Sequence, residues 1–178
     1  MKRLVKMTLN SSFRSGFCLH NEEALFEEYL EKNDFTLSGF SFGAQKVFEE
    51  AYSSKNRVDK IQLISPAFFQ NKDLKYKRMQ LMFFKKDAKT YCENFLKNLL
   101  YPTHKSLEAY FSQGSYEELE SLLYYVWDEK KLEELVLRGV KIEVFLGDKD
   151  KIIDASAVKA FFLPFATVYY IKNAGHIL

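Results

Sequence analysis

Apolar and polar residues follow two different periods along this chain, and the two periods predict alternating strands and helices. The extended apolar runs that are typical of strands cover residues 4–9, 35–37, 60–66, 140–147 and 167–171, and residues 13–19 are predicted as a strand end that runs into a glycine turn. Apolar residues at helical spacing cover residues 21–30, with Asn21 as a predicted N-cap, 44–51 and 155–162. Such alternation predicts an α/β fold with a mostly parallel sheet flanked by helices. Its site is expected at the carboxyl ends of the strands.

The stretch from about Phe69 to Leu137 interrupts this alternation, because its pattern is helical and contains no obvious strand. We expect a helical insertion between two strands, with enough aromatic and leucine side chains to pack on the sheet domain and roof a pocket. The predicted division is an α/β core over residues 1–68 and 138–178 and a helical lid over residues 69–137, within one compact domain.

The composition of the chain indicates which classes of protein it can belong to. The chain has 178 residues, and its 17 Phe and 11 Tyr supply large apolar side chains for a real core. The net charge of +2 is too small to indicate a nucleic-acid-binding protein. Two cysteines occur, Cys18 and Cys92, far apart in sequence and without the spacing of metal or redox motifs. This usage indicates a reduced, cytosolic protein.

The N-terminus begins with basic residues but has no apolar run long enough for a secretory signal. No later stretch approaches the length of a membrane span. We therefore expect a cytoplasmic protein that uses no metal or other cofactor and binds neither membrane nor nucleic acid.

The segment Gly39-Phe40-Ser41-Phe42-Gly43 has a Gly-x-Ser-x-Gly pattern between a predicted strand and a predicted helix. Side chains at Gly39 and Gly43 would collide with the neighbouring strand and helix, and Ser41 is expected in a strained backbone conformation with its hydroxyl clear of the sheet. The N–H of Phe42 would lie at the helix start, where the helix dipole favours negative charge. This turn predicts a nucleophile and half of an oxyanion hole; an ordinary Gly-Ser turn is the alternative.

A serine hydroxyl is a poor nucleophile without a base, usually a histidine that a carboxylate orients. His176 follows the last predicted strand, which would place it at the same edge of the sheet as Ser41. The other two histidines, His20 and His104, are expected at the surface or in a pocket lining.

Three carboxylates follow the strand over residues 140–147: Asp148, Asp150 and Asp154. The turn after Gly147 leaves Asp150 on the far side of the bend, where it could reach His176. Asp148 is the competing candidate, and turn formation or helix N-capping is the alternative role for all three.

The order Ser41, Asp150, His176, each after a predicted strand, resembles that of the α/β-hydrolase superfamily. The resemblance implies a reduced α/β-hydrolase fold in which Ser41 is the nucleophile, His176 the base and Asp150 the acid that orients the base. Ser15-Gly16-Phe17 takes the place of the family's His-Gly-aromatic segment, which implies the N–H of Phe17 as the second oxyanion donor beside that of Phe42. The helix that commonly follows the family's histidine is missing, so we expect His176 to be held less rigidly.

More narrowly, the short chain, the Ser-Gly-Phe start and the basic insertion resemble the short form of the bacterial pimeloyl-acyl carrier protein methyl ester esterases of biotin synthesis. This resemblance implies a serine carboxylesterase that hydrolyses the methyl ester of a carrier-bound pimeloyl chain. It also implies acyl carrier protein, with its phosphopantetheine arm, as the partner.

The charges of the insertion favour an acidic partner, independently of the family resemblance. Residues 70–105 carry nine Lys or Arg against three Asp or Glu, a net charge of +6, whereas residues 106–135 carry two against eight, a net charge of −6. The positive half would attract an acidic carrier, and a solvated helix face is the alternative. The candidate carrier-binding residues are Lys72, Lys75, Lys77, Arg78, Lys85, Lys86 and Lys89.

Two other functions remain open. One is a different serine esterase or thioesterase of small acyl substrates, whose activity would be indifferent to a carrier and to salt. The other is a non-catalytic module that binds an acyl chain or its carrier. The complete spacing of the three triad residues argues against the second, because binding alone does not need them.

Overall fold

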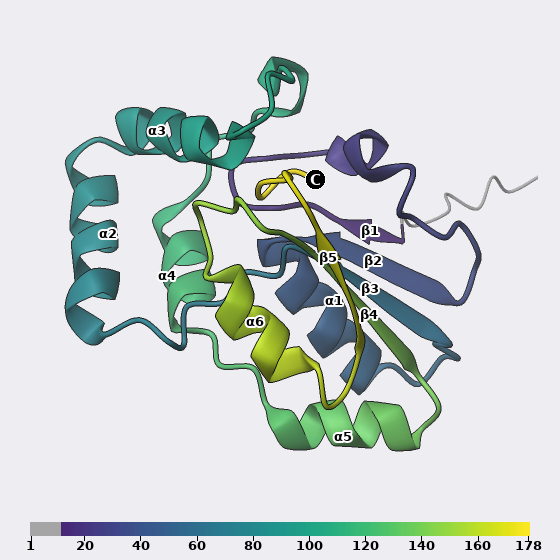
Figure 1. Cartoon of the computed structure of the whole chain (residues 1–178). Helices are drawn as coiled ribbons and strands as arrows, with labels where there is room; N and C mark the ends of the chain where they lie inside the picture. Colours follow the sequence, from purple (N-terminus) through teal and green to yellow (C-terminus); the bar gives the residue numbers. More distant parts are fainter. Residues whose placement is uncertain (1–11) are drawn as a thin grey trace, which may run out of the picture.

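The fold centres on one parallel sheet with helices on its faces (Figure 1), in a computed structural model that describes residues 12–178. The strand predicted over residues 4–9 lies outside the described residues. The strands lie side by side in chain order, β1-β2-β3-β4-β5, and each neighbouring pair is parallel. Their bounds are β1 Phe13–Arg14, β2 Thr36–Phe40, β3 Lys60–Ile64, β4 Lys141–Gly147 and β5 Thr167–Ile171. The predicted α/β class is therefore confirmed.

Six α-helices and two short 3₁₀ helices are described within residues 12–178. The α-helices are α1 Phe42–Ser53, α2 Leu74–Lys86, α3 Ala88–Leu100, α4 Tyr116–Tyr124, α5 Glu129–Leu137 and α6 Ala155–Phe162. The 3₁₀ helices are η1 Glu22–Phe26 and η2 Glu108–Tyr110. The predicted helix over residues 155–162 is confirmed at both ends, and the one predicted over residues 44–51 extends further in both directions.

The two faces of the sheet carry two separate apolar cores, because successive strand residues point to opposite sides. On β4, Val144 and Leu146 belong to the larger core, which α1, α4, α5 and α6 share, whereas Phe145 between them belongs to the smaller one. The smaller core also contains Phe26 of η1 and Ile177 near the C-terminus. Figure 1 shows α1 and α6 on one side of the sheet and η1 with the C-terminus on the other.

The chain between β3 and β4 contains α2, α3, η2, α4 and α5, and its role as a lid separate from the core stays a prediction. Figure 1 shows α2 and α3 away from the sheet, with α2 packed against both α3 and α4. The last helix of this region, α5, contacts α1 and β4 instead. Its buried residues, Leu132 and Leu135, belong to the larger core.

The helix predicted over residues 21–30 is wrong in type and length. The chain forms only the 3₁₀ helix η1, and Asn21 has a left-handed backbone with φ 55° and makes no side-chain cap. Contacts of Glu22 and Phe26 with other parts of the chain explain why the segment forms η1 instead of a longer helix. The Glu22 carboxylate accepts a hydrogen bond from the N–H of Gly16 at 2.7 Å, and the ring of Phe26 packs 4.7 Å from that of Phe40. Both side chains are fully buried, and these contacts outweigh helical propensity.

No helix within residues 12–178 is both long enough and apolar enough to span a membrane.

Candidate active site

The turn between β2 and α1 has the strained geometry that the Gly-x-Ser-x-Gly pattern predicts. Ser41 has φ 53° and ψ −111°, in the left-handed region that side chains disfavour. A Cβ on Gly39 would lie 2.4 Å from the carbonyl oxygen of Gly43, and a Cβ on Gly43 would lie 1.9 Å from that of Arg14. Both distances are shorter than atoms allow, so glycine at both positions permits β1, β2 and α1 to meet here.

Neighbouring strands hold the strained residue in place. The N–H of Ser41 donates to the carbonyl of Ile64 at the end of β3 at 2.9 Å, and the Ser41 carbonyl accepts from Ala67 at 3.1 Å. Because both backbone groups of Ser41 are paired, the strain is supported by the sheet rather than relieved by local rearrangement.

A chain of hydrogen bonds joins the three predicted triad residues. Ser41 Oγ lies 2.9 Å from His176 Nε2, and His176 Nδ1 lies 2.6 Å from Asp150 Oδ2. The side chains of His176 and Asp150 are both fully buried. An imidazole between a hydroxyl and a buried carboxylate can accept the hydroxyl proton while the carboxylate stabilises the resulting cation. The geometry therefore suits nucleophilic catalysis, and the catalytic roles stay a prediction.

Asp150 is held by the backbone of the loop between β4 and α6. Its Oδ1 accepts hydrogen bonds from the N–H groups of Ile152 at 2.7 Å and Ile153 at 3.0 Å. This leaves Oδ2 for His176. Two backbone donors on Oδ1 therefore fix the direction in which the buried carboxylate points.

His176 is packed on all sides, in contrast to the expected loose hold. Its carbonyl accepts a hydrogen bond from Ser65 Oγ at 2.7 Å, and its ring lies 5.1 Å from that of Phe40. A Cβ on the preceding Gly175 would lie 1.8 Å from the Tyr101 carbonyl oxygen, so the backbone here passes directly against that loop. The buried Ile177 anchors the residue that follows.

The alternative acids and bases make other contacts. Asp148 accepts a hydrogen bond from the N–H of Asn173 at 2.7 Å, and Asp154 caps α6 through the N–H of Ala157. His20 and His104 are exposed, as expected. Among the three candidate carboxylates, Asp150 is the one bonded to His176.

The two predicted oxyanion donors belong to neighbouring loops. Phe42 begins α1, and Phe17 lies in the loop after β1, which Gly43 approaches closely. Within residues 12–178, no hydrogen bond from either N–H to another residue is found. Two free amides near Ser41 suit an oxyanion hole, and this role also stays a prediction.

Glu22 holds the loop that carries Phe17, and sequence reasoning missed it. One carboxylate oxygen accepts from Gly16 N–H, while the buried second oxygen has no partner among the described residues. Burial raises the pKa of Glu22, an effect that the Gly16 N–H partly opposes. A carboxylate buried beside a predicted oxyanion loop could be recognised only from the fold, because in sequence it resembles any acidic residue at a helix start.

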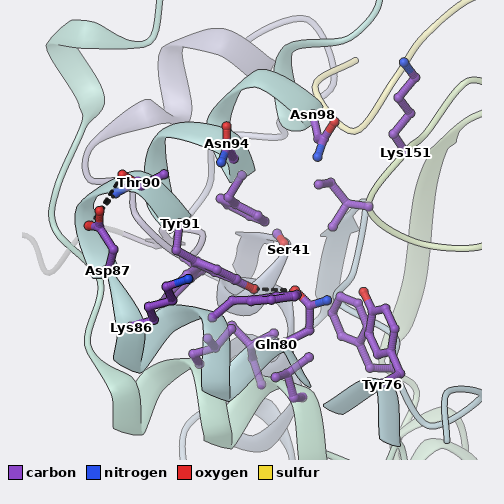
Figure 2. Close-up of a pocket in the computed structure, with 18 residues that line it drawn as sticks. Ser41, Tyr76, Gln80, Lys86, Asp87, Thr90, Tyr91, Asn94, Asn98 and Lys151 are labelled. Atoms are coloured by element: carbon purple, nitrogen blue, oxygen red, sulfur yellow. Dashed lines mark hydrogen bonds between the residues drawn. The ribbon is translucent and has the colours of Figure 1, made fainter. Parts of the chain in front are cut away.

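Ser41 opens into a cavity of about 600 Å³ (Figure 2). Residues of α2, α3, α4 and the β4–α6 loop line it, so the insertion forms much of its wall. Figure 2 shows Asn94 and Asn98 of α3 around the cavity, and the Tyr91 hydroxyl donating to Gln80 Oε1 at 2.9 Å. The apolar lining consists of Phe17, Phe69, Phe83, Phe95, Leu119, Leu122, Leu123 and Ile152.

The candidate carrier-binding residues lie on and around α2, and one of them is buried. Lys75, Arg78, Lys85, Lys86 and Lys89 are exposed, and Lys72 is half-buried. Lys77 is only 6% exposed, and its ammonium lies 5.3 Å from the centre of the Tyr124 ring. Its inclusion in a docking surface is therefore wrong, because the helix turns this side chain inward to a cation–π contact.

Within residues 12–178, no group of three or more His, Cys, Asp or Glu side chains is arranged to bind a metal ion.

Solved structures with a similar fold are esterases and related proteins. The chain aligns with MenH from S. aureus at 15% identity, covering 92% of this chain and 85% of that one, with a TM-score of 0.58. The esterase EaEST from Exiguobacterium antarcticum aligns at 16% identity, covering 87% and 63%, with a TM-score of 0.59. A carboxylesterase from the ammonia-oxidizing Thaumarchaeon Nitrososphaera gargenis aligns at 19% identity, covering 79% and 57%, with a TM-score of 0.56.

These similarities show that the chain has a reduced α/β-hydrolase fold. The chain spans less than two thirds of the length of the two esterases. Comparisons with protein-family models and with curated protein sequences gave no match.

The Asp150→Asn variant tests the acid of the hydrogen-bonded chain. We expect its kcat on a small chromogenic ester to fall roughly 10³- to 10⁴-fold, because an amide cannot stabilise the imidazolium. Asp148→Asn is the matched control: it keeps an oxygen acceptor for Asn173 N–H and should leave kcat near that of the unchanged protein. Equal losses in the two variants would contradict the assignment of Asp150.

The Glu22→Gln variant tests the buried carboxylate through pH. Because the folded state raises the pKa of Glu22, it holds the proton more tightly than the unfolded state does. The free energy of unfolding that Glu22 contributes is therefore fully present below the unfolded pKa and is lost as pH rises through the folded pKa.

Gln keeps an oxygen for Gly16 N–H but does not titrate. Urea denaturation from about pH 4 to 8 should show stability falling with pH in the unchanged protein relative to Glu22→Gln. The exposed Glu28→Gln variant is the control and should follow the unchanged protein. A stability difference between Glu22→Gln and the unchanged protein that stays constant with pH would show that Glu22 has no raised pKa.

Proposed function

We propose that this protein is a serine carboxylesterase that hydrolyses the methyl ester of pimeloyl-acyl carrier protein, releasing methanol, in biotin synthesis. The observation that carries the enzymatic part is the buried chain from Ser41 through His176 to Asp150, whose first member opens into a cavity. The esterases among the proteins of similar fold support the same class of reaction. The substrate follows from the sequence resemblance and from the charges around the cavity.

In the proposed reaction, Ser41 Oγ attacks the ester carbonyl while its proton passes to His176 Nε2. Asp150 accepts from Nδ1–H and stabilises the imidazolium, and the N–H groups of Phe17 and Phe42 bind the oxyanion. His176 then protonates the methoxide as it leaves, giving methanol and an acyl-enzyme. Water, deprotonated by His176, attacks this ester, and the collapse of the second intermediate returns the proton to Ser41 and releases a carboxylate.

The cavity suits a flexible acyl chain. Its lining includes the buried apolar side chains of Phe17, Leu119 and Leu122, which favour methylene groups. Gln80, Asn94 and Asn98 add side-chain amides to the same cavity. Amides can pair with the polar groups of a linker that continues beyond the acyl chain.

The exposed side of α2 suits an acidic protein partner. It presents Lys75, Arg78 and Lys86 together with the exposed apolar side chains Met82 and Phe83, which are 58% and 45% accessible. Phe83 and Lys86 also line the cavity, so this surface continues into the site. Positive charge would steer an acidic carrier toward the cavity, and the apolar side chains would supply contact area.

The decisive experiment measures methanol release from pimeloyl-carrier methyl ester by the unchanged protein and by Ser41→Ala, at low and high salt. A free small ester is assayed alongside. We expect turnover to fall at least about 10³-fold in Ser41→Ala, to be faster on the carrier substrate, and to weaken with salt.

Each other outcome supports a different function. Ser41-dependent turnover of the small ester alone, without response to salt, would support another serine esterase and remove the carrier. No turnover of either substrate, with carrier binding that Ser41→Ala leaves unchanged, would support a binding module.

The charge-reversed variant Lys75→Glu with Arg78→Glu tests the α2 surface separately. At low salt we expect the KM for the carrier substrate to rise roughly tenfold, while kcat/KM for the free ester stays unchanged. Lys55→Glu with Lys141→Glu is the matched control, because it makes the same change in net charge. Both lysines are exposed and lie away from Ser41, one beyond the C-terminal end of α1 and the other at the start of β4. If the control raises the KM as much, net charge rather than this surface attracts the carrier.

A further inference from the structure

The two cysteines, 74 positions apart in sequence, meet inside the protein. The Cys18 thiol donates a hydrogen bond to Cys92 Sγ at 2.8 Å. Cys18 follows Phe17 in the loop after β1, and Cys92 lies on α3. Both are free thiols, and they are 3% and 0% exposed. The spacing in sequence gave no sign of this pair, because only the packing of α3 brings Cys92 to the loop.

The surroundings of the pair favour a thiolate at Cys92. The hydrogen bond from the Cys18 thiol lowers the pKa of Cys92 and raises that of Cys18 itself. The amide of Gln113 donates to Cys92 Sγ at 3.5 Å. The thiolate is the reactive form of cysteine, so Cys92 is the nucleophile of the pair.

The pair is close to solvent although it is buried. Gln113, whose amide contacts Cys92 Sγ, is itself exposed, so a side chain that reaches the surface adjoins the buried sulfur. A Cβ on the buried Gly114 would lie 3.0 Å from Cys18 Sγ, which shows how closely this segment covers the pair. Displacement of the exposed Gln113 side chain is the route by which a small oxidant would reach Cys92.

Metal binding does not explain the pair, because within residues 12–178 no third ligand completes a metal-binding group. Catalysis at Ser41 does not use it either, since neither sulfur contacts the Ser41–His176–Asp150 chain. The chemistry left to two adjoining thiols is oxidation. The sulfurs need to approach by less than about 1 Å to reach disulfide bonding distance.

We propose that Cys18 and Cys92 are a redox modification site that a hydroperoxide converts to an intramolecular disulfide. The Cys92 thiolate attacks the peroxide oxygen, the O–O bond breaks, and Cys92 becomes a sulfenic acid while the leaving oxygen takes up a proton. The Cys18 sulfur then attacks Cys92 Sγ, forming the S–S bond and expelling the oxygen as water. Two thiols are oxidised and one peroxide is reduced.

The disulfide would tie the Phe17 loop to the cavity wall. α3 contributes Tyr91, Asn94 and Asn98 to that wall, and Cys92 is the neighbour of Tyr91. The present contacts between the Phe17 loop and α3 are non-covalent, such as the packing of the Phe17 ring 5.5 Å from the ring of Phe95. Cross-linking residues so far apart in sequence restricts the unfolded chain and stabilises the folded one.

The test treats the reduced full-length protein with hydrogen peroxide, quenches it, and alkylates remaining thiols under denaturing conditions. Mass spectrometry should show a monomer that has lost two hydrogen atoms and takes up no alkylating group, with Cys18 and Cys92 in one linked peptide. The Tm should rise by about 5–10 °C and return on reduction with dithiothreitol. Cys18→Ser and Cys92→Ser should show neither change.

The mass measurement decides the proposal even if a serine variant does not fold, because it is made on the unchanged protein. Alkylation of both thiols after peroxide treatment would overturn the proposal. So would a disulfide between two copies of the chain, or oxidation of Cys92 that stops at the sulfenic acid or passes to a sulfinic acid.

Discussion

The rest of the site depends on the close approach of three backbone segments around Ser41. β1, the end of β2 and the start of α1 come so near that Gly39 and Gly43 have no room for a Cβ. Ser41 is fixed between them at φ 53°, a conformation that costs of order 1–3 kcal/mol. Its backbone hydrogen bonds to β3 and to the segment after β3 offset that cost. The same approach brings the Phe17 loop beside the start of α1, so one constraint positions both the hydroxyl and the predicted oxyanion donors.

The buried Asp150 and His176 complete the site, and hydrogen bonds from their surroundings offset the cost of burying them. Removing a carboxylate from water is costly unless its oxygens are paired. Asp150 has backbone donors on one oxygen and His176 on the other. His176 in turn has its carbonyl bonded to Ser65 and its ring against Phe40. These groups come from the end of β2 and from the segments that follow β3, β4 and β5, so the site lies at the carboxyl ends of the strands.

Local patterns predicted the strands, the nucleophile turn and the meeting of Ser41, Asp150 and His176, because each depends on short-range periodicity or on strand topology. Contacts made by the folded chain could not be predicted in this way. The buried contacts of Glu22 accompany the short η1 in place of the predicted longer helix, and Lys77 points inward to Tyr124 although Lys75 and Arg78 are exposed. Periodicity describes one element at a time, whereas these outcomes depend on which distant side chain lies opposite.

The connection between β3 and β4 also places the nucleophile and its base on opposite sides of a long stretch of chain. The nucleophile turn needs only β1, β2, α1 and β3, which are near one another in sequence, whereas Ser41 and His176 are 135 positions apart. Contacts of such long range form slowly, because the closure of a long loop loses entropy before the contact forms. The strained serine can therefore be in place while the histidine and its carboxylate are still undocked. A chain that had formed only the turn would hold a serine with no base to deprotonate it, so the reactivity of the hydroxyl requires β4 and β5 to be in place.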